Sequence, residues 1–459
     1  MVLDEAGRTG DNRIMTLERA FISLNRFGYG PDVRGLAAAP QAASNPGAFL
    51  MSQIRNPVMP ANMQDRGGVD KSTAFMRATR GDDPERVQEI MTELWEDYTT
   101  FIDDLTRERI NSPNPFAERL VAFWTNHFTV SLQNRATLGL YRDYQYKAIR
   151  PHIAGNFADM LIAAAQHPAM LLYLDNIISF GPNSRFAARR GRGLNENLAR
   201  EILELHTLGV NGGYTQTDVV ELAKMLTGWT LGRERGEGVV SEFSFVNFVH
   251  EPGDKTLLGQ TFREDGVNEG IKALRMLAVH PSTARHVAQK LATHFISDNP
   301  PESLVSRWEH VVKHANRELY KKAAGLVNAP ESGTQPLNKI KTTPDFVISA
   351  FRATGNTQPE RRQILGSFET MDFRAFNAPS PQGFSDQSAD WAAPGAVMKR
   401  IEWAQQFSKR MRVSMNPYEL GQKLFGPVMS GPTAFALEGA ESGQQGLVLL
   451  LMSPEFQRR

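Results

Sequence analysis

The sequence predicts a mostly α-helical fold: a bundle-like globular domain of many helices with one small β-hairpin near residues 242–263. Along most of the chain, apolar residues recur at the three- and four-residue spacing of an amphipathic helix. The one clear strand signal is in 242–263, where Phe243, Phe245 and Val249 alternate only roughly, HEPGDK supplies a turn and TLLGQTF can return as the second strand. The 459 residues suffice for a large core. We therefore expect a flexible segment over 1–16 and a single large helical domain over 17–459.

Helical periodicity divides the chain into a succession of expected helices. A strong example is Pro115–Phe128, which places aromatic and aliphatic residues and His127 on one stripe. The expected helices are Leu17–Asn25, Arg86–Arg107, Pro115–Phe128, Tyr141–Ala165, Pro168–Leu174, 194–208, Gln216–Leu226, Val267–Ala278, Ser282–Phe295, Glu302–Ala324, Pro344–Thr354, Pro359–Leu365, 396–412, 416–425 and 434–452.

Long loops are expected near 56–85, 328–341 and 377–395. The first is polar and carries Pro and Gly, and the third, NAPSPQGFSDQSADWAAPG, is irregular throughout. Irregular segments of this length inside compact domains are often functional. In the third loop, Ser385 lacks the GxSxG elbow of serine hydrolases, and Trp391 suits a core anchor better than a stacking face for a ligand.

The helix expected over 194–208, called the polar helix below, has one polar face. At about 100° per residue, its polar residues fall within an arc of roughly 140°, and its Leu, Ile and Ala residues take most of the other side. His206 falls among the apolar residues, so we expect it to point inward. The polar arc consists of Glu196, Asn197, Arg200, Glu201, Glu204 and Thr207.

Two interpretations of the polar arc remain open. Glu196, Arg200 and Glu204 follow one another at four-residue intervals, a spacing that supports a solvated helix face. The charge pattern alone favours this interpretation. In the alternative, the arc lines a cleft in which carboxylates bind a cation or move protons, with Arg200 adjusting their pKa values.

A glycine-rich turn and a second helix follow the polar helix. Gly209 suits a left-handed helix cap, and two further glycines permit a sharp reversal. Thr215 and Asp218 have the spacing of a capping box. The second helix, Gln216–Leu226, carries apolar residues at helical spacing. The sequence therefore predicts a helical hairpin.

Composition excludes several classes of protein. Lys and Arg total 51 and Asp and Glu total 50, and a net charge of +1 argues against a general nucleic-acid binder. The chain has no cysteine, which excludes disulfides, thiolate nucleophiles and Cys-ligated metal centres.

No transmembrane segment is expected either. The longest apolar stretch, 160–174, is interrupted by His167 and Pro168 and is too short to cross a bilayer. The first residues lack the apolar centre of a signal peptide, so we expect a cytoplasmic protein, with export as the alternative. Because the helical pattern begins near residue 17, Met15 is an alternative start to Met1.

The histidines on apolar helix faces have a structural and a functional interpretation. A buried histidine hydrogen-bonded to a carbonyl is the default for His127. In the functional interpretation, His127 meets His206 across the core as a ligand or general base, and Glu196, Glu201 or Glu204 completes a site for a divalent metal. Of these, His127, His206 and Glu201 are the proposed metal ligands. The Glu-x-x-His pair of di-iron bundles is missing from the polar helix.

Six segments in order resemble the bacterial family catalogued as domain of unknown function 1800. The early LNRFGYGP agrees with the N-terminal pattern of that family, and the resemblance runs from about Leu17 to Arg459. The six segments are ERLVAFWTNHFTVS, MLLYLDNIISFGPNS, GLNENLAREILELHTLGVNGGYTQTDVVELAKMLTGW, HEPGDKTLLGQTF, HPSTARHVAQKLATHF and LLMSPEFQRR.

The resemblance implies a genomic context but no catalytic residue. Members are often encoded beside a second family, number 1501, which is similar to the alkaline-phosphatase/sulfatase fold. Many members carry export signals, which the N-terminal residues here lack.

Two classes of function therefore remain open. One is an enzyme or ligand-binding protein that uses an acidic pocket, with or without a divalent metal. This hypothesis predicts that Glu201 and Glu204 are shielded from solvent and approach a histidine. The other is a non-catalytic partner or maturation factor for a family 1501 protein, and predicts an exposed apolar patch and a solvated acidic arc. The pocket residues are His127, Glu196, Arg200, Glu201, Glu204 and His206.

Overall fold

The computed structural model of the chain is built almost entirely of helices, as the sequence predicts. Within the described residues, no helix is long and apolar enough to cross a membrane. The segment 1–16, expected to be flexible, lies outside the described residues. Those residues are 17–55, 67–187, 193–233, 240–314, 319–333, 337–411 and 415–459.

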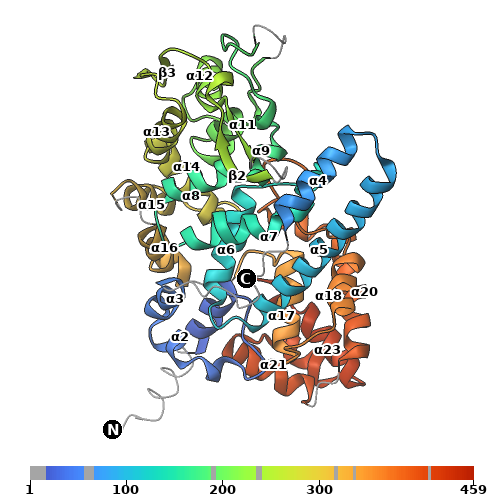
Figure 1. Cartoon of the computed structure of the whole chain (residues 1–459). Coiled ribbons are helices and arrows are strands. Elements are labelled where there is room, and N and C mark those ends of the chain that lie inside the picture. The colour runs from blue at the N-terminus through green and yellow to red at the C-terminus, as the bar shows by residue number, and fades with distance from the viewer. Residues whose placement is uncertain are drawn as a thin grey trace.

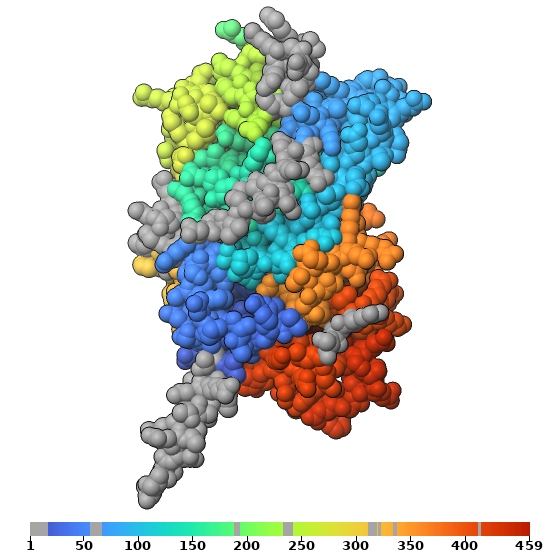
Figure 2. Space-filling view, turned by 60° about the horizontal axis from the view of Figure 1, so that its bottom comes forward, coloured from blue at the N-terminus to red at the C-terminus, as the bar shows by residue number. Residues whose placement is uncertain are grey.

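The first described helices lie in the same half of the molecule as the C-terminal helices, and the middle of the chain forms the opposite end. In Figures 1 and 2, the green and yellow helices and strands of residues 200–280 form one end, and the orange and red helices of the C-terminal part form the opposite end. Helix α6 (Pro115–His127) lies between them, beside the hairpin of α4 (Gly68–Arg80) and α5 (Pro84–Asn111). Helix α6 is thus at the centre of the fold.

Helices in the first half of the chain begin where the sequence supplies a cap. The Asp83 carboxylate accepts a hydrogen bond from the backbone N–H of Arg86 at the start of α5, and proline opens both α5 and α6. After a helix over residues 17–26, the further elements up to residue 228 are α2 (Pro40–Ser44), α3 (Pro46–Arg55), α7 (Tyr141–Asp143), the π-helix η3 (Tyr144–Ile149), α8 (Phe157–Gln166), α9 (Pro168–Tyr173), α11 (Asn197–Glu201), the π-helix η6 (Ile202–His206) and α12 (Gln216–Leu226).

The second half of the chain combines two small sheets with a further series of helices. Thr342 and Asp345 form the capping box that starts α17. The elements are β1 (Trp229–Arg233), β2 (Val240–Phe245), β3 (Lys255–Leu257), β4 (Gln260–Phe262), α13 (Val267–Ala278), α14 (Pro281–Phe295), α15 (Glu302–His314), α16 (Leu319–Val327), α17 (Thr343–Ala353), α18 (Arg361–Thr370), α19 (Ser388–Trp391), α20 (Pro394–Arg410), α21 (Pro417–Phe425), α22 (Gly431–Glu438), α23 (Gly443–Met452) and α24 (Pro454–Gln457).

The loop expected over 56–85 is wrong for its second half, where α4 forms a helix that packs on α5. The buried residues of α4 include Gly68, Ser72 and Thr73, so its buried face is too small and too polar to give a hydrophobic period. Close backbone packing holds the helix instead, because a Cβ on Gly68 would lie 2.1 Å from the carbonyl oxygen of Gly139. Residues 56–66 lie outside the described residues.

The expected hairpin near 242–263 exists as two separate hairpins. Strand β2 pairs with the preceding β1, placing Trp229 opposite Phe245, while β3 pairs with β4 across a tight turn. The pairing expected between β2 and the TLLGQTF segment is therefore wrong. The intervening His250 is held in the interior, where its Nδ1 lies 2.8 Å from the carbonyl oxygen of Thr227. With His250 held there, the segment after β2 does not pair with β2.

The helical hairpin after residue 194 forms as predicted, with one change in its first helix. Gly209 adopts a left-handed φ of +85°, Thr215 and Asp218 form the capping box, and α12 has the expected bounds. The polar helix, however, changes from α-helix to π-helix at Ile202. Such π turns break the regular spacing of side chains and carbonyl groups, and they are frequent at functional sites.

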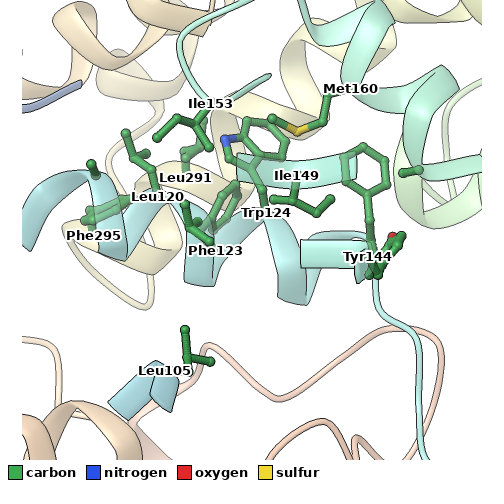
Figure 3. Close-up of a cluster of buried hydrophobic side chains, with 14 of the residues drawn as sticks. Leu105, Leu120, Phe123, Trp124, Tyr144, Ile149, Ile153, Met160, Leu291 and Phe295 are labelled. Carbon is green, nitrogen blue, oxygen red and sulfur yellow. The ribbon is translucent and has the colours of Figure 1, made fainter. Parts of the chain in front are cut away.

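The core around α6 is aromatic. Figure 3 shows Phe123 and Trp124 of α6 close to Leu291 of α14 and to Met160 of α8. Phe123 and Trp124 are each only 2 % exposed, and burying one such side chain contributes about 1.5–3 kcal/mol. In the same view Leu105 of α5 stands apart from this cluster. It lines the cavity described below.

We predict that Gly209→Ala destabilises the protein more than Gly213→Ala does. Both glycines have a left-handed φ, +85° and +89°. An alanine at either position would destabilise the fold by about 1–2 kcal/mol, because its Cβ disfavours this conformation. Only at Gly209 would the new Cβ meet a neighbour, 2.9 Å from Nδ1 of His286, whereas nothing lies within 4 Å at Gly213. Urea unfolding of the two variants measures the difference, and equal losses would contradict the predicted contact.

Candidate functional site

A cavity of about 140 Å³ lies between α5, α6, α17 and the irregular segment 372–387. Its walls are largely apolar, and the segment expected as a long loop at 377–395 supplies part of them. Within that segment the structure adds only one short helix, α19, before α20 begins. Apolar lining residues include Ile102, Leu105, Ala122, Ile348, Phe373 and Phe384.

A chain of four polar side chains borders this cavity, and Arg119 of α6 is at its centre. Arg119 is 1 % exposed, and its Nη1 lies 2.5 Å from Oδ2 of Asp345 on α17. Its Nη2 lies 3.1 Å from Nε2 of His294 on α14. The other ring nitrogen of His294, Nδ1, lies 2.6 Å from Oδ1 of Asp386. We call Asp345, Arg119, His294 and Asp386 the buried charge chain.

The hydrogen bonds assign the protonation state of the buried charge chain. A guanidinium only donates, so Nε2 of His294 accepts from Arg119, and Nδ1 carries the proton that is donated to Asp386. Burial lowers the pKa of His294, against the opposing effect of Asp386, so the imidazole stays neutral. Burial raises the pKa of Asp386, but His294 and the nearby Lys290 and Lys339 outweigh it, and the carboxylate stays ionised.

Further cations surround the acidic members of this chain. Nη1 of Arg459 lies 2.6 Å from the Asp345 carboxylate, and the ammonium of Lys339 donates to the backbone oxygen of Asp386. Lys341, 1 % exposed, places its Nζ 4.4 Å from the centre of the Phe456 ring. Burial lowers the pKa of Lys341 to about 7, helped by Arg119 and opposed by Asp345.

The polar helix does not line this cavity, and its charged arc is half-buried. Arg200 Nη2 lies 2.8 Å from Oε2 of Glu196, and the Gln216 side chain bonds to both residues at 3.0 and 2.8 Å. Burial and the neighbouring Glu204 raise the pKa of Glu201. The arc thus fastens the hairpin of α11 and α12, and no contact joins these carboxylates to a histidine among the described residues.

His127 and His206 do meet, as predicted, and His286 of α14 joins them. The ring centres of His127 and His206 are 6.0 Å apart, and those of His127 and His286 are 6.3 Å apart. Nε2 of His127 donates to the carbonyl oxygen of His206 at 3.1 Å, and Nε2 of His286 donates to that of Leu205 at 3.0 Å. Carbonyl groups at the end of a helix lack partners within it. The two imidazoles therefore cap the polar helix.

Burial keeps these histidines neutral. It lowers the pKa of His206 to about 3 and that of His286 to about 4, and Lys290 adds to both effects. The pKa of His127 also lies well below its ordinary value, chiefly because of burial. The expected hydrogen bond from His127 to a carbonyl is confirmed.

The metal hypothesis gains no geometric support. In the parts of the chain that the structure describes, no three or more His, Asp or Glu side chains converge in a way that would hold a metal ion. His127, His206 and Glu201 as metal ligands, and the polar arc as a catalytic group, stay predictions. The proposals below do not depend on them.

Comparison with protein families agrees with the resemblance of the six segments. The model for a protein of unknown function, DUF1800, matches residues 22–458. The chain belongs to the DUF1800 family. Searches of curated proteins and of solved structures found no match to this DUF1800 chain.

Sequence reasoning missed the buried charge chain, although a signal for part of it was present. On α14, His286, Lys290 and His294 recur every four residues, which places three ionisable side chains on one stripe of a helix that is otherwise apolar there. Asp386 lies in the long irregular segment that was expected to be functional. Nothing in the spacing along the chain indicated that Arg119 would join the two.

We predict that the free energy of unfolding of the wild type rises between pH 7 and pH 9, and that Lys341→Met removes this rise. Unfolded lysine has a pKa of about 10.4, whereas burial lowers that of Lys341 to about 7. Between these values the unfolded state holds more protons, so stability increases as pH rises and is lost as pH falls toward 7. The expected slope is at most about 1.4 kcal/mol per pH unit.

The measurement is the free energy of unfolding in urea at pH 7 and at pH 9 for the wild type and the variant. The variant should lose the slope, while Lys399→Met, a change at an exposed lysine on α20, should keep it. An unchanged slope in Lys341→Met would contradict a neutral Lys341 in the folded state.

Proposed function

We propose that this DUF1800 chain binds a small organic molecule in the cavity beside the buried charge chain. The observation that carries the proposal is a cavity of about 140 Å³ that combines apolar walls with buried charged groups. Ligand sites typically have this composition, a mainly apolar surface with a few fixed polar groups. An apolar cavity of about 150 Å³ accepts benzene in another protein, so one ring or a branched aliphatic group matches the volume here.

The polar side of the cavity is suited to stabilising negative charge. Arg119 is held from both sides by Asp345 and by His294, and His294 is in turn oriented by Asp386. A fixed guanidinium beside apolar walls stabilises an anion, whether this belongs to a bound ligand or develops in a reaction.

Covalent catalysis has no comparable support. Among the described residues that line the cavity, no hydroxyl is hydrogen-bonded to a histidine, which a serine or threonine nucleophile would require. The chemistry therefore favours binding and charge stabilisation. The partnership with a family 1501 protein stays a prediction from the resemblance, and the acidic pocket of the polar helix stays one from the residue pattern.

We predict that Ala122→Leu abolishes binding of a neutral probe of the size of the cavity. Ala122 lines the cavity from α6, and a leucine there occupies the space of one small ring. The probe is benzyl alcohol, observed by ligand-detected NMR with the full chain. The matched control is Ala163→Leu, at a half-buried helical alanine on α8 that does not line the cavity.

The wild type and Ala163→Leu should bind benzyl alcohol, and Ala122→Leu should not. If Ala122→Leu binds benzyl alcohol as well as the wild type does, or if the wild type binds no probe of this size, charged or neutral, the cavity is not a ligand site. Circular dichroism of each variant establishes that a loss of binding is not a loss of fold.

A further inference from the structure

Arg109 of α5 differs from the other charged side chains around the cavity. It lines the cavity, yet it has no carboxylate within ion-pair distance and no hydrogen bond among the described residues. Its neighbour Arg107, by contrast, places Nε 3.0 Å from Oδ1 of Asp103. A guanidinium beside apolar walls without a counter-ion is costly, because a charge removed from water needs a partner.

Three buried polar atoms on the cavity wall have neither a hydrogen-bond nor an ion-pair partner among the described residues: Nε of Arg109, Nε of Arg119 and Oε1 of Gln145. Arg119 and Gln145 are 1 % and 0 % exposed, so water reaches almost none of the surface of these residues. Two of the three atoms are donors that belong to cations, and the third is a neutral acceptor. The charge preference of this wall is therefore set by the two guanidinium groups.

The carboxylates on the same wall are already occupied. Asp345 is shared by Arg119 and Arg459, at 2.5 and 2.6 Å. Asp386 accepts a hydrogen bond from Nδ1 of His294 at 2.6 Å. Arg109 is thus left without an ion pair at the cavity, because the adjacent Glu108, which it also influences, is paired with Arg150 at 2.9 Å.

We propose that the ligand of this cavity is a compact monocarboxylate, whose carboxylate is bound by Arg109 with Arg119 beside it, and whose aromatic or branched apolar group occupies the remaining space. This inference rests on the proposed function and adds the chemical class of the ligand. Guanidinium and carboxylate groups match in geometry and form short, charge-assisted hydrogen bonds. The apolar group meets Phe373, Phe384 and Trp391, which all line the cavity. The ring centre of Phe373 lies 5.1 Å from that of Phe384 and 6.2 Å from that of Trp391.

The test compares three probes of nearly equal size and different charge: benzoate, benzyl alcohol and benzylammonium. Isothermal titration calorimetry with the full chain near pH 7 measures their affinities. Benzoate should bind at least about tenfold more tightly than benzyl alcohol, which corresponds to about 1.4 kcal/mol, since a hydrogen bond between two charged groups is stronger than one to a neutral hydroxyl. Benzylammonium should bind most weakly.

Arg109→Gln should remove the preference for benzoate over benzyl alcohol while leaving binding of the alcohol in place. The matched control is Arg107→Gln, two residues earlier on α5, where the arginine pairs with Asp103 and does not line the cavity. That variant should keep the preference of the wild type.

The outcomes separate the two proposals. If benzyl alcohol or benzylammonium binds the wild type as tightly as benzoate does, the cavity is a ligand site but the carboxylate inference is overturned. If none of the three probes binds, the proposed function fails and the inference fails with it. If Arg109→Gln retains the preference, Arg109 does not recognise the anion. The comparison of probes on the wild type needs no variant, so it holds even where Arg109→Gln does not fold.

Discussion

The burial of Arg119 is the constraint on which the centre of this molecule depends. A guanidinium that is 1 % exposed is tolerated only where charged or accepting groups meet it, because an unpaired buried charge costs several kcal/mol. Here the partners come from three separate parts of the chain: Asp345 from α17, His294 from α14, and Asp386 behind it from the irregular segment before α19. Satisfying one side chain therefore fixes the relative positions of α6, α14 and α17, and it ties an otherwise irregular segment to them.

The cavity is a consequence of the same arrangement. The buried charge chain joins α6, α14 and α17 to the segment that carries Asp386, and aromatic side chains of that same segment, such as Phe373 and Phe384, add apolar walls. Arg109 enters this space from α5 without a counter-ion of its own. The fold thus offers both apolar volume and an unbalanced positive charge at one place, which is the basis of the inferred ligand class.

The histidines of the polar helix illustrate how a conspicuous sequence pattern can have a structural role. His127 and His286 donate to the carbonyl oxygens of His206 and Leu205, where the π turn ends the helix. Their pKa values are lowered chiefly by burial, so they remain neutral donors. These contacts account for two inward-facing histidines without a bound ligand.

Local features of the fold could be predicted from the sequence because they depend on neighbouring residues. The bounds of α12, its Thr215–Asp218 capping box and the left-handed Gly209 are set within a few residues, and each is confirmed. Helix α4 was missed because its buried face contains Ser72 and Thr73 and is recognised only through its packing on α5.

The site was missed for a related reason. Arg119 and His294 are 175 residues apart, and His294 and Asp386 are 92 apart, so no local spacing reports their meeting. The predicted meeting of His127 and His206 succeeded because both lie on strongly apolar helix faces, which a single core brings together.

The most direct test of this account is a double-mutant cycle on the buried charge chain, with His294→Asn, Asp386→Asn and the double variant compared by urea unfolding. If the chain organises the core as described, the two changes are coupled by about 1–3 kcal/mol, since the second change costs little once the first partner is gone. Effects that add, with a coupling below about 0.3 kcal/mol, would contradict the central place given to these residues.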